Sequence, residues 1–156
     1  KAAFKALALP LAGSFGALFA GWASDKIFNS KRAPVIVCML FMLAGATYLY
    51  PNLSSFHWVY SFICLLVIGF LIYGPHVMIC ANISMDYGTR KAASSTAGFI
   101  DGFGYLGASL VGVTSGYLID HYSWHAAFYY WVCGALLGAL LMSFLWNYKP
   151  IKKEYY

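Results

Sequence analysis

The chain has 156 residues, of which 62% are hydrophobic and only 10% are charged, with a formal net charge of +5. This composition excludes a water-soluble globular domain, because too few polar residues are present to cover one of this size. The basic residues lie almost entirely in short connections between apolar stretches, so the positive charge indicates membrane topology and no nucleic-acid partner.

Five apolar stretches are each long enough to cross a bilayer as a helix, which requires about 20 mostly apolar residues. They are expected at 6–23, 33–50, 57–83, 92–119 and 124–147. Because the connections are short, we predict an all-α transmembrane bundle in the lipid bilayer without a second domain. The chain starts at Lys1 and not at a methionine, so we expect it to be a piece of a longer protein.

The lysines and arginines of the connections alternate along the chain, and this alternation predicts the orientation of each span. They occur after the first span, after the third span and in the tail: Lys26, Lys31, Arg32, Arg90, Lys91, Lys149, Lys152 and Lys153. The connections 51–56 and 120–123 contain none. We therefore expect a multi-pass protein of the inner or plasma membrane with a cytoplasmic C-terminus. Lys1 and Lys5 alone depart from the pattern.

The connection after the first span contains a glycine, an Asp-Lys pair and then a basic pair: Gly21, Asp25, Lys26, Lys31 and Arg32. A solvated basic loop explains the basic pair but leaves the glycine and the aspartate unexplained. The whole pattern resembles the cytoplasmic loop signature of the major facilitator superfamily. This resemblance implies that the charges hold neighbouring helices together in one gating state.

The third span carries the segment GFLIYGPH, in which Pro75 removes a backbone donor and clashes with the preceding turn. We expect a kink between Leu71 and Pro75. Tyr73 lies ten residues before the end of this predicted span, and so near the middle of the membrane. His76 is either a polar group of a binding site or a histidine that hydrogen-bonds between helices.

Asp101 is the only acidic residue inside any predicted span. At a rise of 1.5 Å per residue it lies about 14 Å from the cytoplasmic edge, near the middle of the bilayer. A carboxylate at that depth must face water or a partner helix. Ala97, Asp101, Tyr105 and Ser109 recur every four residues, so they share one helix face and form a candidate cavity lining. The alternative is a structural hydrogen bond between helices.

Glycines at four-residue spacing predict close packing between helices. They are Gly98 with Gly102, Gly112 with Gly116, and Gly134 with Gly138. The four cysteines lie within or beside apolar stretches without a CxxC spacing, and the histidines are not clustered. We therefore predict no disulfide framework, no metal site and no cofactor.

Four segments together resemble the organophosphate:phosphate antiporter family of the major facilitator superfamily. They are GWASDKIF, GFLIYGP, the pair Arg90-Lys91 before two alanines, and TAGFIDGFGYLGAS. The resemblance covers nearly the whole chain, and it is closest to glycerol-3-phosphate transporters in GFLIYGP and FGYLG. In the twelve-helix fold of this family the chain corresponds to helices eight to twelve, so the N-terminal half is expected to be missing.

The resemblance implies antiport of an organic phosphate against inorganic phosphate, at a site between two helical halves. The two arginines with which the family grips phosphate cannot be assigned, because Arg32 and Arg90 both lie in predicted loops. The tyrosines that line the family's cavity correspond to Tyr73 and Tyr105. Together with His76 and Asp101 they form the predicted substrate-binding set.

The substrate stays open between a sugar phosphate and glycerol phosphate. Asp101 stands where glycerol-phosphate transporters have glycine and resembles eukaryotic sugar-phosphate exchangers; a carboxylate accepts hydrogen bonds from sugar hydroxyls. The lysine of hexose-phosphate carriers falls at Ile100, however, and Pro10 replaces an acidic residue of glycerol-phosphate transporters.

Two other functions remain as alternatives. Some members of the family sense sugar phosphate and signal to a membrane kinase, and a non-transporting membrane fragment would bind no phosphate ester. An enzyme is not expected, because no span carries a metal-ligand cluster or a nucleophile beside a base.

Overall fold

The computed structural model describes residues 2–87 and 92–147, and all the elements in these ranges are helical. They are α1 (Ala2–Lys26), α2 (Arg32–Phe56), α3 (Trp58–Val77), the π-helix η1 (Met78–Ile83), α4 (Ser84–Tyr87), α5 (Ala93–His121) and α6 (Trp124–Ser143). Five segments of the described chain are long and apolar enough to cross a membrane, α3, η1 and α4 forming one of them. The prediction of an all-α transmembrane protein with five spans is therefore confirmed.

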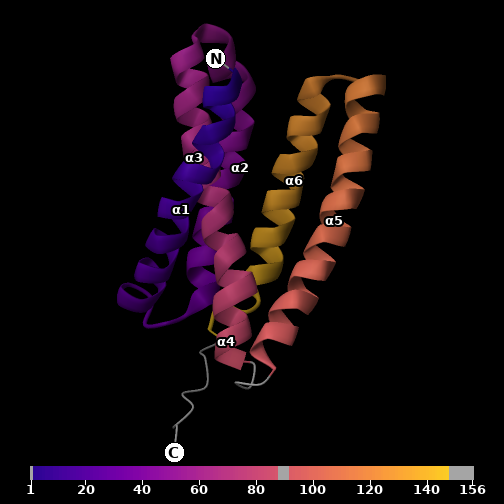
Figure 1. The fold of residues 1–156 in the computed structure, drawn as a ribbon. Helices are drawn as coiled ribbons and strands as arrows, with labels where there is room; N and C mark the ends of the chain where they lie inside the picture. Colours follow the sequence, from indigo (N-terminus) through magenta and orange to yellow (C-terminus); the bar gives the residue numbers. More distant parts are fainter. Residues whose placement is uncertain (1, 88–91, 148–156) are drawn as a thin grey trace, which may run out of the picture.

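In Figure 1, α1, α2 and α3 lie close together, and α6 and α5 stand beside them. α1 packs along α3, α2 packs against both α3 and α6, and α5 stands beyond α6. The turn between α1 and α2 and the end of α4 lie at one end of the bundle, lower in Figure 1. The connections from α2 to α3 and from α5 to α6 lie at the opposite end. Lys26, Lys31 and Arg32 thus mark the lower end.

The connection between the second and third spans is shorter than predicted. Residues 51–56, expected as a loop, continue α2 to Phe56, and His57 alone separates α2 from α3. Serine hydroxyls bond backbone carbonyl groups near the end of the helix, where some carbonyls lack a partner within the helix. Ser54 Oγ donates to the Pro51 carbonyl at 3.0 Å, and Ser55 Oγ donates to the Asn52 carbonyl at 2.7 Å. His57 Nδ1 then accepts from the backbone N–H of Val59 and caps α3.

The helix changes type just after Pro75, whereas the kink expected between Leu71 and Pro75 stays a prediction. Pro75 is inside α3, which stays α-helical to Val77, and the backbone widens into the π-helix η1 over Met78–Ile83. π-helical turns of this kind are rare and frequent at functional sites. The segment from His76 to Cys80 crosses the change in helix geometry.

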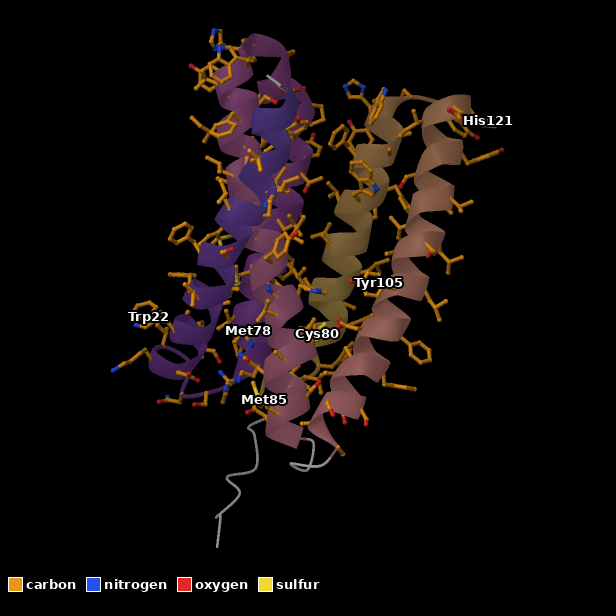
Figure 2. The ribbon with its side chains drawn as sticks, in the orientation of Figure 1. Trp22, Met78, Cys80, Met85, Tyr105 and His121 are labelled. Atoms are coloured by element: carbon orange, nitrogen blue, oxygen red, sulfur yellow. The ribbon has the colours of Figure 1, made fainter. Side chains whose placement is uncertain are left out.

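The core lies where α1, α2, α3 and η1 meet. Its fully buried side chains are apolar and mostly small or medium-sized: Ala20, Ala23, Val35, Ile36, Met39, Leu71 and Met78. In Figure 2, Met78 lies between η1 and the α1–α2 side of the bundle, whereas Trp22 points outward from α1. This core fixes the rotation of α3 and η1, and with it the direction of the polar groups described below.

Close approach between helices occurs at other glycines than the predicted ones. A Cβ atom added at Gly69 would lie 2.5 Å from the Leu9 carbonyl oxygen, and one at Gly16 would meet the Phe70 carbonyl. The α1 and α3 backbones therefore touch where only glycine fits. The predicted pairs of α5, such as Gly98 with Gly102, have no described atom within 4 Å of their Cβ positions. Gly134 is equally open, and Gly138 meets only the Leu40 side chain at 3.6 Å.

Candidate functional site

The predicted loop motif forms a network of charged and polar side chains at the lower end of the bundle. Arg32 begins α2, and its Nη1 donates to Asp25 Oδ1 at 2.8 Å and to Ser24 Oγ at 3.2 Å. Its Nε donates to Asp86 Oδ2 at 2.9 Å. One guanidinium thus joins the end of α1, the start of α2 and α4, using the separate donors that only arginine offers.

The turn between α1 and α2 holds this network in place. Asn29 and Ser30 adopt left-handed backbone angles, with φ of 52° and 62°, and so reverse the chain within a few residues. The Ser30 N–H donates to the Ser24 carbonyl at 2.8 Å, and Ser24 Oγ donates to the Lys31 carbonyl at 3.1 Å. The position of Asp25 relative to Arg32 therefore follows from the turn.

Asp86 is the member of the network that the sequence did not reveal. The Arg32 and Asp86 side chains are 16% and 20% exposed, whereas Asp25 is 58% exposed, so the Arg32–Asp86 pair is the less hydrated of the two. Partly buried pairs are less screened by water and salt than exposed ones. The sequence offered one signal for this pair: Asp86 ends the third span, at the same end of the bundle as the basic loop with Arg32.

The other residues of the motif take different places. Lys31 Nζ donates to Asn147 Oδ1 at 3.2 Å and so reaches the segment after α6. Lys26 is exposed at the last position of α1, and Gly21 has no described atom within 4 Å of its Cβ position. The predicted basic residues Arg90, Lys91 and those of the tail lie outside the described part of the chain.

A second polar site is a cavity of about 360 Å³ between α3, η1 and α5. Its polar lining comes from His76, Cys80, Asp101 and Tyr105. In Figure 2, Cys80 and Tyr105 lie in the space between η1 and the helix pair α5 and α6. The structure therefore brings together three of the four predicted substrate-binding residues: His76 from α3, and Asp101 and Tyr105 from α5.

Three side chains of this cavity form a tight cluster. One ligand atom each from the His76 ring, the Cys80 thiol and the Asp101 carboxylate lies within 4.8 Å of the other two. His76 Nδ1 and Cys80 Sγ are 3.9 Å apart. No metal site was predicted from the sequence: the four-residue spacing of His76 and Cys80 was visible in it, but Asp101 joins them only in the folded chain, where α5 meets the α3–η1 segment.

Tyr73 does not line this cavity, although its depth suggested that it would. Its ring packs on α1, where a Cβ at Gly13 would lie 2.5 Å from Tyr73 Cδ2. Depth along a span fixes height in the membrane but not the direction of a side chain. Ala97 and Ser109, predicted on the Asp101 face, also lie outside the lining, and the Ser109 hydroxyl donates to the Tyr105 carbonyl of its own helix.

A larger hollow of about 860 Å³ on the α1, α2 and α3 group carries no polar chemistry. Its lining consists of apolar residues and glycine, among them Leu11, Phe15, Met42 and Phe70. Such a surface suits lipid chains and not a phosphate ester. The smaller cavity at Asp101 is the candidate binding site, because its lining contains a carboxylate and an imidazole.

Comparisons with known proteins agree on one family. The model of the Major Facilitator Superfamily matches residues 3–155. The chain is 33% identical over 137 residues to the glycerol-3-phosphate transporter of Bacillus subtilis, covering 87% of the chain and 31% of that relative. It is 33% identical over 138 residues to a probable hexose phosphate transport protein of Chlamydia trachomatis, covering 88% and 30%.

A relative with a different role is equally similar. The membrane sensor protein UhpC of Escherichia coli is 34% identical over 135 residues, which cover 85% of the chain and 30% of that protein. No solved structure matches the chain. The chain spans about a third of the length of the curated relatives it matches.

Proposed function

Because the chain belongs to the major facilitator superfamily, we propose that it is the part of a secondary transporter that exchanges a sugar phosphate or glycerol phosphate for inorganic phosphate. The observation that carries this proposal is the polar cavity at Asp101, set in a chain whose relatives are named as transporters of such phosphate esters. The protein is an integral membrane protein of a transporter family, and no catalytic role is proposed for it.

In this proposal the cavity binds the organic part of the substrate. Asp101 accepts hydrogen bonds from hydroxyl groups, and the Tyr105 hydroxyl and the His76 ring can each donate or accept one. A carboxylate repels phosphate, so the phosphate group would bind away from Asp101. Tyr73 is left out of the binding set because its ring faces α1.

The Arg32 network would act as a latch at the lower end of the bundle. Its bonds to Asp25 and Asp86 hold α1, α2 and α4 together, and they must weaken if these segments separate during transport. A state that keeps the network closes this end, and a state that breaks it opens the end. The two states would then differ in the energy of two ion pairs, of which Arg32–Asp86 is the less exposed.

We also propose that the lower end faces the cytoplasm, because Lys26, Lys31 and Arg32 gather there. Single cysteines at Lys31 and at Ser55, on opposite ends, test the orientation in intact cells. A membrane-impermeant maleimide should label Ser55→Cys and spare Lys31→Cys. Labelling of Lys31→Cys alone would reverse the topology.

Exchange is tested in proteoliposomes that contain the complete protein and are loaded with radiolabelled phosphate. Addition of glycerol 3-phosphate or glucose 6-phosphate outside should release the label, and the Asp101→Asn variant should raise the KM for the accepted ester about tenfold or more, as expected for a lost hydrogen bond to a charged group. Asp120→Asn is the matched control, because Asp120 lies exposed at the end of α5. No exchange with either ester would refute the transport function.

A membrane sensor is the second candidate, because UhpC is as similar to the chain as the transporters are. A sensor would bind the phosphate ester, measured by calorimetry, without releasing label from the liposomes. A non-transporting fragment would do neither.

A further inference from the structure

The cluster of His76, Cys80 and Asp101 has the dimensions of a metal site. Zinc binds sulfur at about 2.3 Å and nitrogen at about 2.0–2.1 Å, which separates the two ligand atoms by about 3.6 Å in a tetrahedral site. His76 Nδ1 and Cys80 Sγ are 3.9 Å apart, and the three ligand atoms all lie within 4.8 Å of one another. Small side-chain rotations would therefore bring all three into coordination distance.

Asp101 has the Cys80 thiol as a hydrogen-bond partner but no cation beside it among the described residues. Asp101 lies inside a membrane span, and among the described residues no lysine, arginine or histidine forms an ion pair with it. A carboxylate in a membrane is costly unless it is paired or hydrated. A cation bound beside it would supply the missing positive charge.

The types of ligand select the class of cation. Thiolate and imidazole suit zinc and other late transition metals, whereas magnesium and calcium prefer oxygen ligands. His76 and Cys80 are four residues apart, so they lie on one side of the α3–η1 segment, and Asp101 faces them from α5. Three protein ligands leave one position of a tetrahedron for water.

We propose that His76, Cys80 and Asp101 bind one transition-metal ion of the zinc type, which joins η1 to α5. Binding displaces the thiol proton of Cys80 to solvent and leaves a coordinated thiolate. The ion would join η1, which packs against the core, to the loosely packed α5. His76 and Asp101 also belong to the proposed substrate-binding set, but metal binding is measured without substrate, so either proposal can fail alone.

Cobalt(II) serves as the spectroscopic probe, added to the complete purified protein in detergent. We expect a thiolate-to-cobalt charge-transfer band in the near ultraviolet, with one ion per chain, and loss of the band when zinc is added. Cys80→Ser should abolish the band, and Asp101→Asn and His76→Gln should each weaken cobalt binding at least tenfold. Cys133→Ser is the matched control, because it removes an exposed cysteine of α6 and should leave the spectrum unchanged.

Absence of the band in the native protein, or its survival in Cys80→Ser, would overturn the proposal. Unchanged affinity in Asp101→Asn or His76→Gln would equally overturn the three-ligand site. If Cys80→Ser does not fold, the site is tested on the native protein by alkylation. Mass spectrometry then measures the rate at which Cys80 is modified. Zinc should slow alkylation of Cys80 at least tenfold and leave that of Cys133 unchanged, and equal rates with and without zinc would contradict the site.

Discussion

The α1–α3 pair and α5 are both rich in small residues, yet they use them in opposite ways. At the α1–α3 crossing Gly16 and Gly69 face the backbone of the other helix, where no side chain fits. In α5, Gly102 and its neighbouring glycines have no described atom within 4 Å of their Cβ positions, and Ser115 is the only buried residue. One region is therefore held by backbone contact, and the other is held to the rest of the described chain by a few side chains.

The difference matters because the polar cavity lies on the border between the two regions. His76 and Cys80 belong to the segment whose rotation the tight core fixes, whereas Asp101 and Tyr105 belong to the loosely held α5. A displacement of α5 would change the size of the cavity without disturbing the core. Packing density thus separates a fixed wall of the site from a movable one.

The largest expected effect comes from the crossing itself. Gly69→Ala places a methyl group 2.5 Å from the Leu9 carbonyl oxygen. Since the contacting atom is backbone and cannot rotate away, the free energy of unfolding should fall by about 3 kcal/mol, at the upper end of the usual cost of overpacking. Thermal unfolding in detergent measures it, and a Tm equal to that of the native protein would show that the two helices are not in backbone contact.

The next effect tests the ionic latch of the tight region. Arg32→Ala leaves Asp86, whose side chain is 20% exposed, without its cation, and should cost about 2 kcal/mol, less than for a fully buried pair. Arg32→Lys should restore only part of the loss, because one ammonium cannot reproduce the separate Nε and Nη1 bonds. Lys26→Ala removes an exposed cation from the same end and serves as the control. Equal stability of Arg32→Ala and Lys26→Ala would show that the Arg32 network does not hold these helices together.

A smaller effect is expected where α5 is attached to α6. Trp131 Nε1 donates to the buried Ser115 Oγ at 2.8 Å. Ser115→Ala should lower stability by about 1 kcal/mol, the size of one hydrogen bond between membrane helices. Ser109→Ala removes a hydroxyl that donates to the Tyr105 carbonyl of its own helix. This variant should therefore lower stability less than Ser115→Ala. Hydrogen exchange of the α5 amides should be faster in Ser115→Ala only.

The smallest effect is expected for Gly102→Ala, which makes the same change as Gly69→Ala at an open position. Gly102→Ala adds a methyl group where no described atom lies within 4 Å. Alanine is the better helix former by about 1 kcal/mol, so stability should stay equal or rise slightly. A loss as large as that of Gly69→Ala would mean that another helix packs on this face of α5, and the contrast between the two regions would disappear.

The sequence predicted the candidate site in part. The depth of Asp101 and of the His76 segment followed from counting residues along each span, and the structure places both in one cavity. The same count placed Tyr73 there, but its ring packs on α1. Cys80 and Asp86 were missed because Asp101 and Arg32, with which they interact, are distant in the chain.

Length, hydropathy and the places of lysine and arginine determined the class of protein and its five spans, and four short motifs carried the resemblance to a family. Hydropathy and charge act on each segment separately, because a span needs only its own apolar residues and the charges at its ends to insert into the membrane. Only the tertiary structure decided which glycines touch a backbone, which carboxylates meet Arg32 and which side chains share the cavity at Asp101. These depend on the rotation of each helix about its axis, which the fit of side chains between helices sets, and that fit arises only when the helices meet.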